Sequence, residues 1–255
     1  MKTISVIIPY FRSNKFFSKT LNSVLGQTYR NFEIIIVFDD NNKNELLLLK
    51  RLIKNKKKIK LIINKKNIGA GPSRNKGAKI AKGRYLAFID SDDLWKRHKL
   101  KNQMTFMLKN KIDISYTKYS IIDENNIKLL ERPIKIKTSY SDLLNDCNIG
   151  LSTVMIKKSL FLKYGFSSNR TKEDYSLWLK ISKKVDIYGY NRSLTSWRKV
   201  KNSLSSNTMQ KLYDAFNIYH KKEKFNIVNS LYRVFILSCN FIKKSFLAKY
   251  DKSLN

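Results

Sequence analysis

The sequence predicts an α/β fold with a parallel, doubly wound sheet flanked by helices and a helical extension at its C-terminal end. Short apolar runs alternate with segments of helical spacing through the first half of the chain. Two of these runs end directly in carboxylates, at the edge where an open α/β sheet binds its ligand. Hydrophobic residues make up 42% of the 255 residues, which is enough for one large domain, or one domain and a small appendage.

The N-terminal part supplies the regular alternation. Apolar runs predict strands at residues 4–8, 32–38 and 59–63, and helical spacing predicts helices at residues 16–27 and 45–55. The second strand ends in Asp39 and Asp40. Because buried strands joined by helices are typical of a parallel sheet, these two acids are expected at its carboxyl edge.

A glycine-containing segment, residues 67–77, precedes the next helix. Pro72 suits the first turn of a helix, and the glycines let the backbone approach a ligand closely. A helix start with Arg74 nearby favours an anion such as a diphosphate. The third glycine of the dinucleotide fingerprint is missing, so a plain helix start explains this segment equally well.

The stretch GRYLAFIDSDDLW, residues 83–95, contains the densest group of acids. Its apolar run, residues 85–89, predicts a buried strand that ends in Asp90, Asp92 and Asp93. Carboxylates crowded at a strand end repel each other unless a cation is near, and a divalent ion bound to phosphates would supply it. The stretch indicates a metal–phosphate site, with a capping turn before the next helix as the alternative.

The second half is less regular. The pattern predicts a helix at residues 98–110, a hairpin of residues 112–118 and 127–130, and strands at residues 152–156 and 194–200. A polar loop brings Glu173 and Asp174 into the first turn of an amphipathic helix, where acids are also ordinary partners of the helix dipole. The polar segment at residues 202–207 follows the last strand.

Composition limits the partners and the location. The formal charge of +33 fits either a polyanionic partner or a drift in composition toward Lys, Asn and Ile. No nucleic-acid-binding module accompanies the lysines, so nucleic acid is not expected as a partner. Cys147 and Cys239 match no ligand spacing and are expected as reduced thiols. The first apolar run is too short for a signal peptide and no segment is long enough to span a bilayer, so a cytoplasmic protein is expected.

Seven segments together resemble family 2 glycosyltransferases with the GT-A fold, whose Rossmann-like central sheet is mostly parallel. They are SVIIPYF, SVLGQTY, FEIIIVFDD, NIGAGPSRNKG, FIDSDDLW, KEDYSLWLKI and SWRKVKNSLSSN, in the family's order and spacing. The resemblance covers about residues 3–207, so we expect a catalytic domain at residues 1–207 and a basic, amphipathic helical extension at residues 208–255. It implies an inverting transferase that moves a hexose or N-acetylhexosamine from a nucleotide-diphosphate donor. The expected acceptor is a hydroxyl of a surface glycan, such as lipopolysaccharide, or of its lipid-linked precursor.

The resemblance also assigns the donor site. It places three residues of the first loop beside the nucleotide base: Pro9, Tyr10 and Arg12. Asp39, with Asp40 beside it, matches the acid that hydrogen-bonds a uracil-like base. Since a carboxylate can accept the N3–H of uracil and cytosine has no such proton, a UDP-sugar is the expected donor. Arg74 matches the residue on the diphosphate side.

The metal and the base follow from the same resemblance. Asp90 and Asp92 are the acids of the DxD motif, with Asp90 nearer the ribose, Asp92 on Mg²⁺ or Mn²⁺, and Asp93 in support. Asp174 matches the catalytic base, and Glu173 would orient the loop or contact the acceptor. Val200 stands where many relatives have a metal-binding His, which leaves the choice of metal open.

Two alternatives remain open. The chain could be an inactive GT-A-like module that binds anionic lipid or glycan without transfer. The tail, residues 225–250, is too polar to span a membrane but suited to lie in its interface, which predicts a peripheral protein on the inner face of the cell membrane. It could equally pack back on the rest of the chain or form a contact between subunits of an oligomer of unknown size.

Overall fold

The computed structural model describes residues 4–169, 171–200 and 207–253. The predicted polar segment at residues 202–207 therefore falls outside the described residues except for Asn207, whose side chain caps the helix that follows it.

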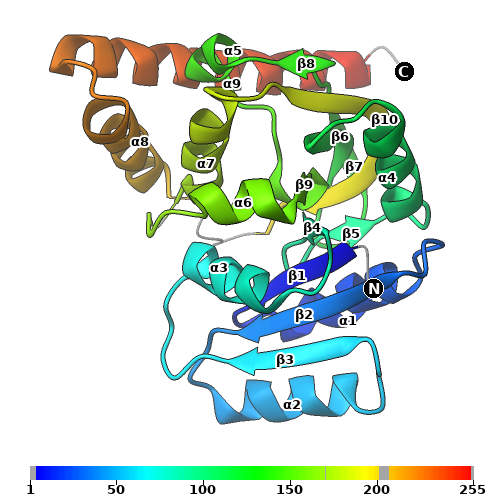
Figure 1. The fold of residues 1–255 in the computed structure, drawn as a ribbon. Coiled ribbons are helices and arrows are strands. Elements are labelled where there is room, and N and C mark those ends of the chain that lie inside the picture. Colours follow the sequence, from blue (N-terminus) through cyan, green and yellow to red (C-terminus); the bar gives the residue numbers. More distant parts are fainter. Residues whose placement is uncertain (1–3, 170, 201–206, 254–255) are drawn as a thin grey trace.

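The described strands form one sheet of ten strands in the order β3-β2-β1-β4-β9-β6-β10-β5, with β7 beside β6 and β8 beside β10 (Figure 1). In the first half, β1 (Ile4–Tyr10), β2 (Phe32–Phe38), β3 (Ile59–Ile63) and β4 (Tyr85–Phe88) run parallel. Short antiparallel β9 (Met155–Lys157) joins this half to the parallel pair of β6 (Ile114–Ile122) and β10 (Ile187–Arg198). The carboxyl ends of β1, β2 and β4 therefore meet at one edge.

Helices cover both faces of the sheet. One apolar cluster holds α1 (Asn14–Leu25), α2 (Lys43–Ile53) and α4 (Lys99–Lys109) against one face. The other holds α3 (Ala70–Ile80), α6 (Lys158–Tyr164) and α7 (Glu173–Ser182) against the opposite face. Neighbouring residues of β1 divide between the clusters, with Ile7 in one and Val6 and Ile8 in the other. The predicted doubly wound architecture is confirmed.

Several predicted boundaries change. The hairpin forms from β6 and β7 (Lys128–Arg132), but β6 continues to Ile122, and β10 begins at Ile187 rather than at residue 194. The strand predicted at residues 152–156 is partly wrong, because Leu151–Thr153 forms a 3-10 turn in which Thr153 Oγ1 donates to Gly150 O at 2.6 Å. Four short elements were not predicted: β5 (Leu94–Trp95), β8 (Lys137–Thr138), α5 (Tyr140–Asn145) and α6.

The C-terminal part consists of α8 (Thr208–Asn217), a π-helical turn (Ile218–Lys222) and the long α9 (Ile227–Ser253), which lies across one end of the molecule (Figure 1). Leu237 of α9 and Tyr219 of the turn are buried in the same apolar cluster as α7. Among the described residues, none of the helices is both long and apolar enough to cross a membrane. Cys147 and Cys239 form no disulfide.

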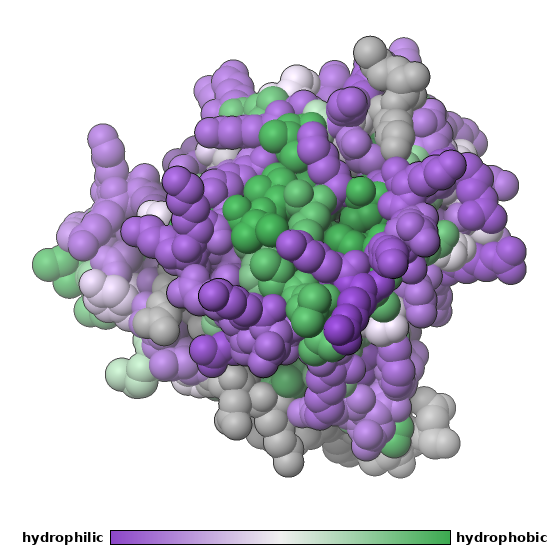
Figure 2. Space-filling model, turned by 90° about the horizontal axis from the view of Figure 1, so that it is seen from below, coloured by the Kyte–Doolittle hydropathy of each residue, from purple (hydrophilic) through white to green (hydrophobic). Residues whose placement is uncertain are grey.

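The opposite end of the molecule is formed by α2 and the edge strand β3. Leu47, Leu48 and Ile63 leave an apolar patch there with a hydrophilic rim (Figure 2). Ten basic residues lie between residues 43 and 66, and lysines beside an exposed sheet edge are a common protection against pairing with another chain.

Candidate active site

The acidic turn after β4 is held from behind by Arg198, the last residue of β10. The Arg198 backbone N–H donates to Asp93 Oδ1 at 2.7 Å, and its Nε donates to the Asp92 carbonyl at 2.8 Å. Its other nitrogens donate to the turn between β6 and β7, at Asp123 O and Asn126 Oδ1. Burial lowers the pKa of Arg198, but four acids partly offset this effect. Arg198 therefore fixes the backbone of the turn and leaves the Asp92 side chain unconstrained by it.

Charge is crowded in this turn. Burial, and then repulsion by Asp90, raises the pKa of Asp92 to about 6 from an ordinary 3.8. Asp93 is fully buried, its Oδ2 has no hydrogen-bond partner among the described residues, and burial raises its pKa well above the ordinary value. A bound cation would lower both pKa values, so the electrostatics of the turn fit the predicted metal.

Arg74 links the acidic turn to the start of α7. Its Nη2 donates to Asp90 Oδ1 at 2.5 Å and its Nη1 to Glu173 Oε1 at 2.8 Å. Burial alone would lower the pKa of Arg74, but Asp90 and Glu173 raise it above its ordinary value. The side chain is only 4% exposed, so in this structure Arg74 organises two carboxylates and does not present its guanidinium to the crevice.

Gly71 allows α3 to approach α7 closely enough for this network. A Cβ at Gly71 would lie 2.9 Å from Ser167 O and 3.1 Å from Glu173 Cγ, so a larger residue would push the loop before α7 away. Asn75, one turn along α3, holds the same loop through both the N–H and the carbonyl of Phe166.

Asp174 lies in the first turn of α7, beside Glu173. Burial first and the Glu173 charge second raise the pKa of Asp174 to about 7. Its side chain accepts only the adjacent Tyr175 N–H, at 2.7 Å, among the hydrogen bonds of the described residues. Of the predicted pair, Glu173 is thus committed to Arg74, whereas Asp174 is the carboxylate with unusual proton affinity.

The two acids after β2 do different things. Asp39 is buried and accepts three hydrogen bonds of 2.8 Å from the segment before α3, donated by Asn64 Nδ2, Ile68 N and Gly69 N. Asp40 accepts two longer backbone bonds, 3.3 Å from Arg12 N and 3.1 Å from Asn42 N. Asp39 therefore serves as an anchor for the α3 loop, and Asp40 is the acid that lies beside the loop after β1.

That loop also differs from the prediction. Pro9 and Tyr10 were predicted to lie in it, but both belong to β1, where they pair with Val37 and Phe38. Tyr10 is buried against Phe17 and Phe38 and donates to Glu45 Oε2 at 2.5 Å, so its ring is part of the core. The loop begins at Phe11, which is 41% exposed, and Arg12, whose φ of 46° makes the sharp turn.

The protein groups available to a metal are few. The described residues contain no cluster of three His, Cys, Asp or Glu side chains arranged to hold a metal ion. Val200, expected to stand where many relatives have a metal-binding His, follows β10 and offers no ligand atom from its side chain. Any divalent ion here would depend on Asp92 and its neighbours together with oxygens of the donor.

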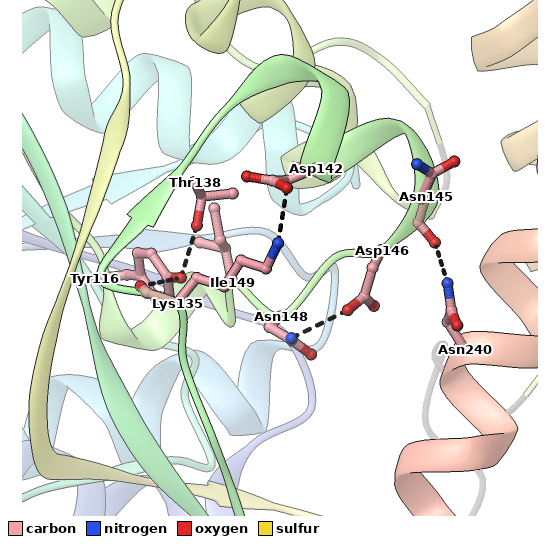
Figure 3. A pocket seen from close by; sticks show the side chains of 9 residues that line it. All are labelled: Tyr116, Lys135, Thr138, Asp142, Asn145, Asp146, Asn148, Ile149 and Asn240. Carbon is pink, nitrogen blue, oxygen red and sulfur yellow. Dashed lines mark hydrogen bonds and ion pairs between the residues drawn. The ribbon is translucent and has the colours of Figure 1, made fainter.

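A separate polar cavity of about 260 Å³ lies between α5, the segment after it and α9 (Figure 3). It contains none of the predicted site residues. Its polar groups pair with each other or with α9: Asp142 with Lys135, Asp146 with Lys244, and Asn145 with Asn240. The cavity therefore marks a polar seam that attaches α9 to the rest of the chain.

Sequence reasoning missed two residues of the site. Phe11 follows the quoted Pro9-Tyr10 pair directly, and an aromatic residue after a strand end is a usable signal for a stacking surface. Arg198 lies within the quoted segment SWRKV, but nothing in the local pattern distinguishes a buried arginine from the many exposed cations around it.

Comparisons with known proteins identify the family of the chain. The sequence model of "Glycosyl transferase family 2" matches residues 5–165. The chain is 32% identical over 245 residues to the putative teichuronic acid biosynthesis glycosyltransferase TuaG of Bacillus subtilis, covering 94% of this chain and 96% of TuaG. It is 38% identical over 212 residues, 82% of each chain, to the Escherichia coli enzyme WfgD, named UDP-Glc:alpha-D-GlcNAc-diphosphoundecaprenol beta-1,3-glucosyltransferase.

Among solved structures, S. aureus TarS 1–349 in complex with UDP-GlcNAc superposes with a TM-score of 0.71 at 18% identity, over 89% of this chain and 69% of that one. At that identity the likeness concerns the fold alone, which is GT-A. The acids after β2 and β4 and the base candidate on α7 therefore lie on a GT-A fold. The chain belongs to glycosyl transferase family 2.

Proposed function

We propose that this glycosyltransferase transfers a hexose or N-acetylhexosamine from a UDP-sugar, with inversion, to a hydroxyl of a lipid-linked glycan precursor. WfgD and the E. coli enzyme WfaP, 35% identical over 222 residues, are both named as UDP-Glc transferases acting on a GlcNAc-diphosphoundecaprenol. TuaG is named for teichuronic acid biosynthesis, which supports a surface glycan as the eventual product. An acceptor of this kind is presented at a membrane, so the enzyme would act at a membrane surface.

The corner formed by Phe11, Arg12 and Asp40 is the proposed nucleoside site. Phe11 offers an exposed ring for stacking, and the Arg12 guanidinium carbon lies 5.1 Å from the centroid of that ring. We assign the base-facing acid to Asp40 rather than to Asp39, since the oxygens of Asp39 are occupied by the α3 loop. A carboxylate in this corner can accept the N3–H of uracil, which favours UDP over CDP.

The leaving diphosphate is proposed to lie over the acidic turn. Asp92 would hold Mg²⁺ or Mn²⁺, with Asp90 toward the ribose and Asp93 in support from behind. A divalent ion there neutralises negative charge that develops on the β-phosphate as the bond to the sugar breaks. Arg74 holds the Asp90 carboxylate and Arg198 holds the backbone carbonyl of Asp92, so two arginines fix the turn while the Asp92 side chain stays available to the ion.

The single observation that carries this function is the place of the Asp174 carboxylate in the first turn of α7, where it accepts only the Tyr175 N–H among the described residues while its neighbour Glu173 is committed to Arg74. Burial and the Glu173 charge also raise the pKa of Asp174 to about 7. A general base must take the proton of the acceptor hydroxyl as that hydroxyl attacks the sugar carbon, and a higher pKa makes a carboxylate a better acceptor. Attack from the side opposite the leaving diphosphate inverts the anomeric centre. Glu173 positions Arg74, and through it Asp90, rather than acting on the acceptor proton.

A donor panel combined with a short-chain lipid-diphosphate GlcNAc acceptor tests the proposal. We expect UDP release only when the acceptor is present together with UDP-Glc or UDP-GlcNAc. Asp174→Asn should lose this release but still bind UDP. Product of β configuration from an α-linked donor, read by NMR, is expected for inversion. Tighter binding of CDP or GDP than of UDP in calorimetry would overturn the donor assignment. Ligand binding without turnover of any donor would instead favour the inactive module.

A further inference from the structure

An ordinary surface helix exposes its polar face, but the long helix α9 exposes an apolar face. Its packed side is mixed: Ser230, Arg233 and Asn240 are polar, whereas Val234 and Leu237 pack in the apolar cluster that contains α7. Its opposite side is apolar and open: the residues that share it at helical spacing, all exposed, are Val228, Leu231, Tyr232, Phe235, Cys239 and Ile242. Val228 is 76% exposed and Phe235 is 64% exposed. We call these six residues the α9 stripe.

The polar side of α9 is bound firmly to the rest of the chain. Arg233 Nη1 donates to Asn145 Oδ1 at 2.5 Å, Asn240 Nδ2 donates to Asn145 O at 2.9 Å, and Lys244 pairs with Asp146. These contacts belong to the polar seam beside the cavity, and Figure 3 shows one of them, the bond between Asn145 and Asn240. The orientation of α9 is therefore fixed, and the exposure of its stripe is a property of the folded chain rather than of a loose tail.

The basic residues around α9 favour an anionic surface as the partner that covers the stripe. Lys221 and Lys224 are exposed just before the helix, and Lys243 is exposed beside the stripe. The whole chain carries a formal charge of +33, which opposes close contact between two copies and attracts an anionic surface. An apolar helix face flanked by lysines is the pattern of a helix that lies in the interface of an anionic bilayer.

We infer that the α9 stripe docks the protein onto the surface of an anionic lipid bilayer. From Val228 to Ile242 the stripe is about 21 Å long at the rise of an α-helix, long enough for several side chains to enter the interface together. The apolar patch on α2 and β3 is the rival surface, but its most exposed member, Leu47, is 49% exposed, and it lies at the opposite end of the molecule (Figures 1 and 2). A flat membrane can therefore contact only one of the two.

Docking through α9 brings the end of the molecule that carries α7 toward the lipid. The hydroxyl of Tyr175, which follows Asp174 in α7, lies 2.7 Å from the hydroxyl of Tyr219 in the turn before α9, and Tyr219 stacks on Phe225 at the base of that helix. The inference concerns an attachment surface and does not depend on the donor or on the identity of the transferred sugar.

Vesicle co-sedimentation of the full-length protein tests the inference. The stripe variant Leu231→Gln/Phe235→Gln is compared with the matched variant Leu47→Gln/Leu48→Gln, which makes the same chemical change on α2. Vesicles contain either phosphatidylcholine alone or phosphatidylcholine with about 30 mol% phosphatidylglycerol, at about 0.05 M and about 0.5 M NaCl. UDP binding and the melting temperature, measured without vesicles, confirm that each variant is folded and that its donor site is intact.

We expect the wild type to bind the anionic vesicles and to lose about tenfold in partitioning at the higher salt. The stripe variant should lose a further tenfold or more, about the effect of removing two exposed apolar side chains from the interface, while the α2 variant binds like the wild type. Vesicle binding that is unchanged in the stripe variant, or lost only in the α2 variant, overturns the inference. So does a wild type that ignores vesicles and forms a dimer that the stripe variant dissociates, which would assign the stripe to a second copy. If the variants still bind UDP, a change in vesicle binding or in dimerisation cannot be attributed to damage at the donor site.

Discussion

Replacing Asp174 by Asn should inactivate the enzyme and stabilise its fold at the same time. The amide keeps the size of the side chain and can still accept the Tyr175 N–H. It cannot take a proton from an acceptor hydroxyl, so we expect kcat to fall by about two to four decades while UDP binding persists. The opposite effect on stability follows from the unusual pKa of the carboxylate.

The magnitude follows from that pKa. In the folded protein the pKa of Asp174 is about 7, against an ordinary 3.8, because burial and the Glu173 charge disfavour the ionised form. Ionisation therefore costs folding stability, and this cost is absent below about pH 4 and complete above about pH 7. At about 1.36 kcal/mol for each pKa unit, the upper bound on this loss of folding stability is about 4 kcal/mol. Because Asp174 is half-buried rather than buried, solvent screening reduces this to about 1–3 kcal/mol. Asn is neutral at every pH, so the variant should be more stable than the wild type by that amount at about pH 8 and equally stable at about pH 4.

Urea unfolding at the two pH values, alongside initial rates, measures both effects. Asp113→Asn is the matched control, because the Asp113 side chain is 44% exposed beside Lys157 and its replacement should change stability by less than about 0.5 kcal/mol. Glu173→Gln should behave in the opposite way and lose stability, since Arg74 would keep only Asp90 as a charged partner. The wild-type rate should also fall as the pH drops below about 7, when Asp174 becomes protonated. An active Asp174→Asn, or one less stable than the wild type at about pH 8, would refute this reasoning.

Three further outcomes are expected. Asp92→Ala should abolish metal-dependent donor turnover, and full activity of this variant with and without a chelator would contradict the metal assignment. Asp39→Asn should lower the melting temperature, because the donors of the α3 loop lose a carboxylate partner, whereas Asp40→Asn should mainly weaken UDP binding, by about tenfold in calorimetry; the reverse pattern would return the base-facing role to Asp39. Lys99→Met should stabilise the protein by about 1–3 kcal/mol in urea unfolding at neutral pH, because burial lowers the pKa of Lys99 well below its ordinary value and its Nζ has no hydrogen-bond partner among the described residues. A less stable variant would show that the packing of this ammonium on the Trp95 ring outweighs its burial.

The parallel half of the sheet could be predicted closely because each of its strands is a mostly apolar run. Residues 32–38 and 59–63 match β2 and β3, since both strands are bounded by polar residues on either side. The start of α2 was missed by two residues because Asn42 caps the helix through Asn44 N and Glu45 N, a local signal that the leucine run obscured. Short elements such as α5, which depends on the capping box of Ser139 and Asp142, carry too few apolar residues to form a period.

The site could be predicted by residue type but not by partner. Acids at the ends of β2 and β4 follow from the pattern of buried strands, and the sequence places them correctly at one edge of the sheet. Which of Asp39 and Asp40 turns inward depends on donors supplied by Asn64 and Gly69, a separate segment whose position is set by tertiary packing. The same holds for Arg74. Its positive charge suggested a diphosphate partner, but in the structure its guanidinium is paired with Asp90 after β4 and Glu173 of α7.

The C-terminal helix illustrates a different limit of sequence reasoning. The amphipathic pattern of residues 225–250 fits either attachment to a membrane or packing against the chain, and the sequence analysis treats the two as alternatives. The structure provides a packed side and an open side together, because the polar face of α9 finds polar partners in Asn145 and Asp146. The apolar face of a helix is normally the one that packs against the protein interior, because burial of apolar area is the larger favourable contribution to the free energy of folding. Its exclusion from the interior here leaves an apolar surface that costs free energy in water, and that cost is removed when the surface enters a lipid interface. Truncation of α9 would remove both sides at once, so substitutions confined to the α9 stripe are what separate attachment from folding.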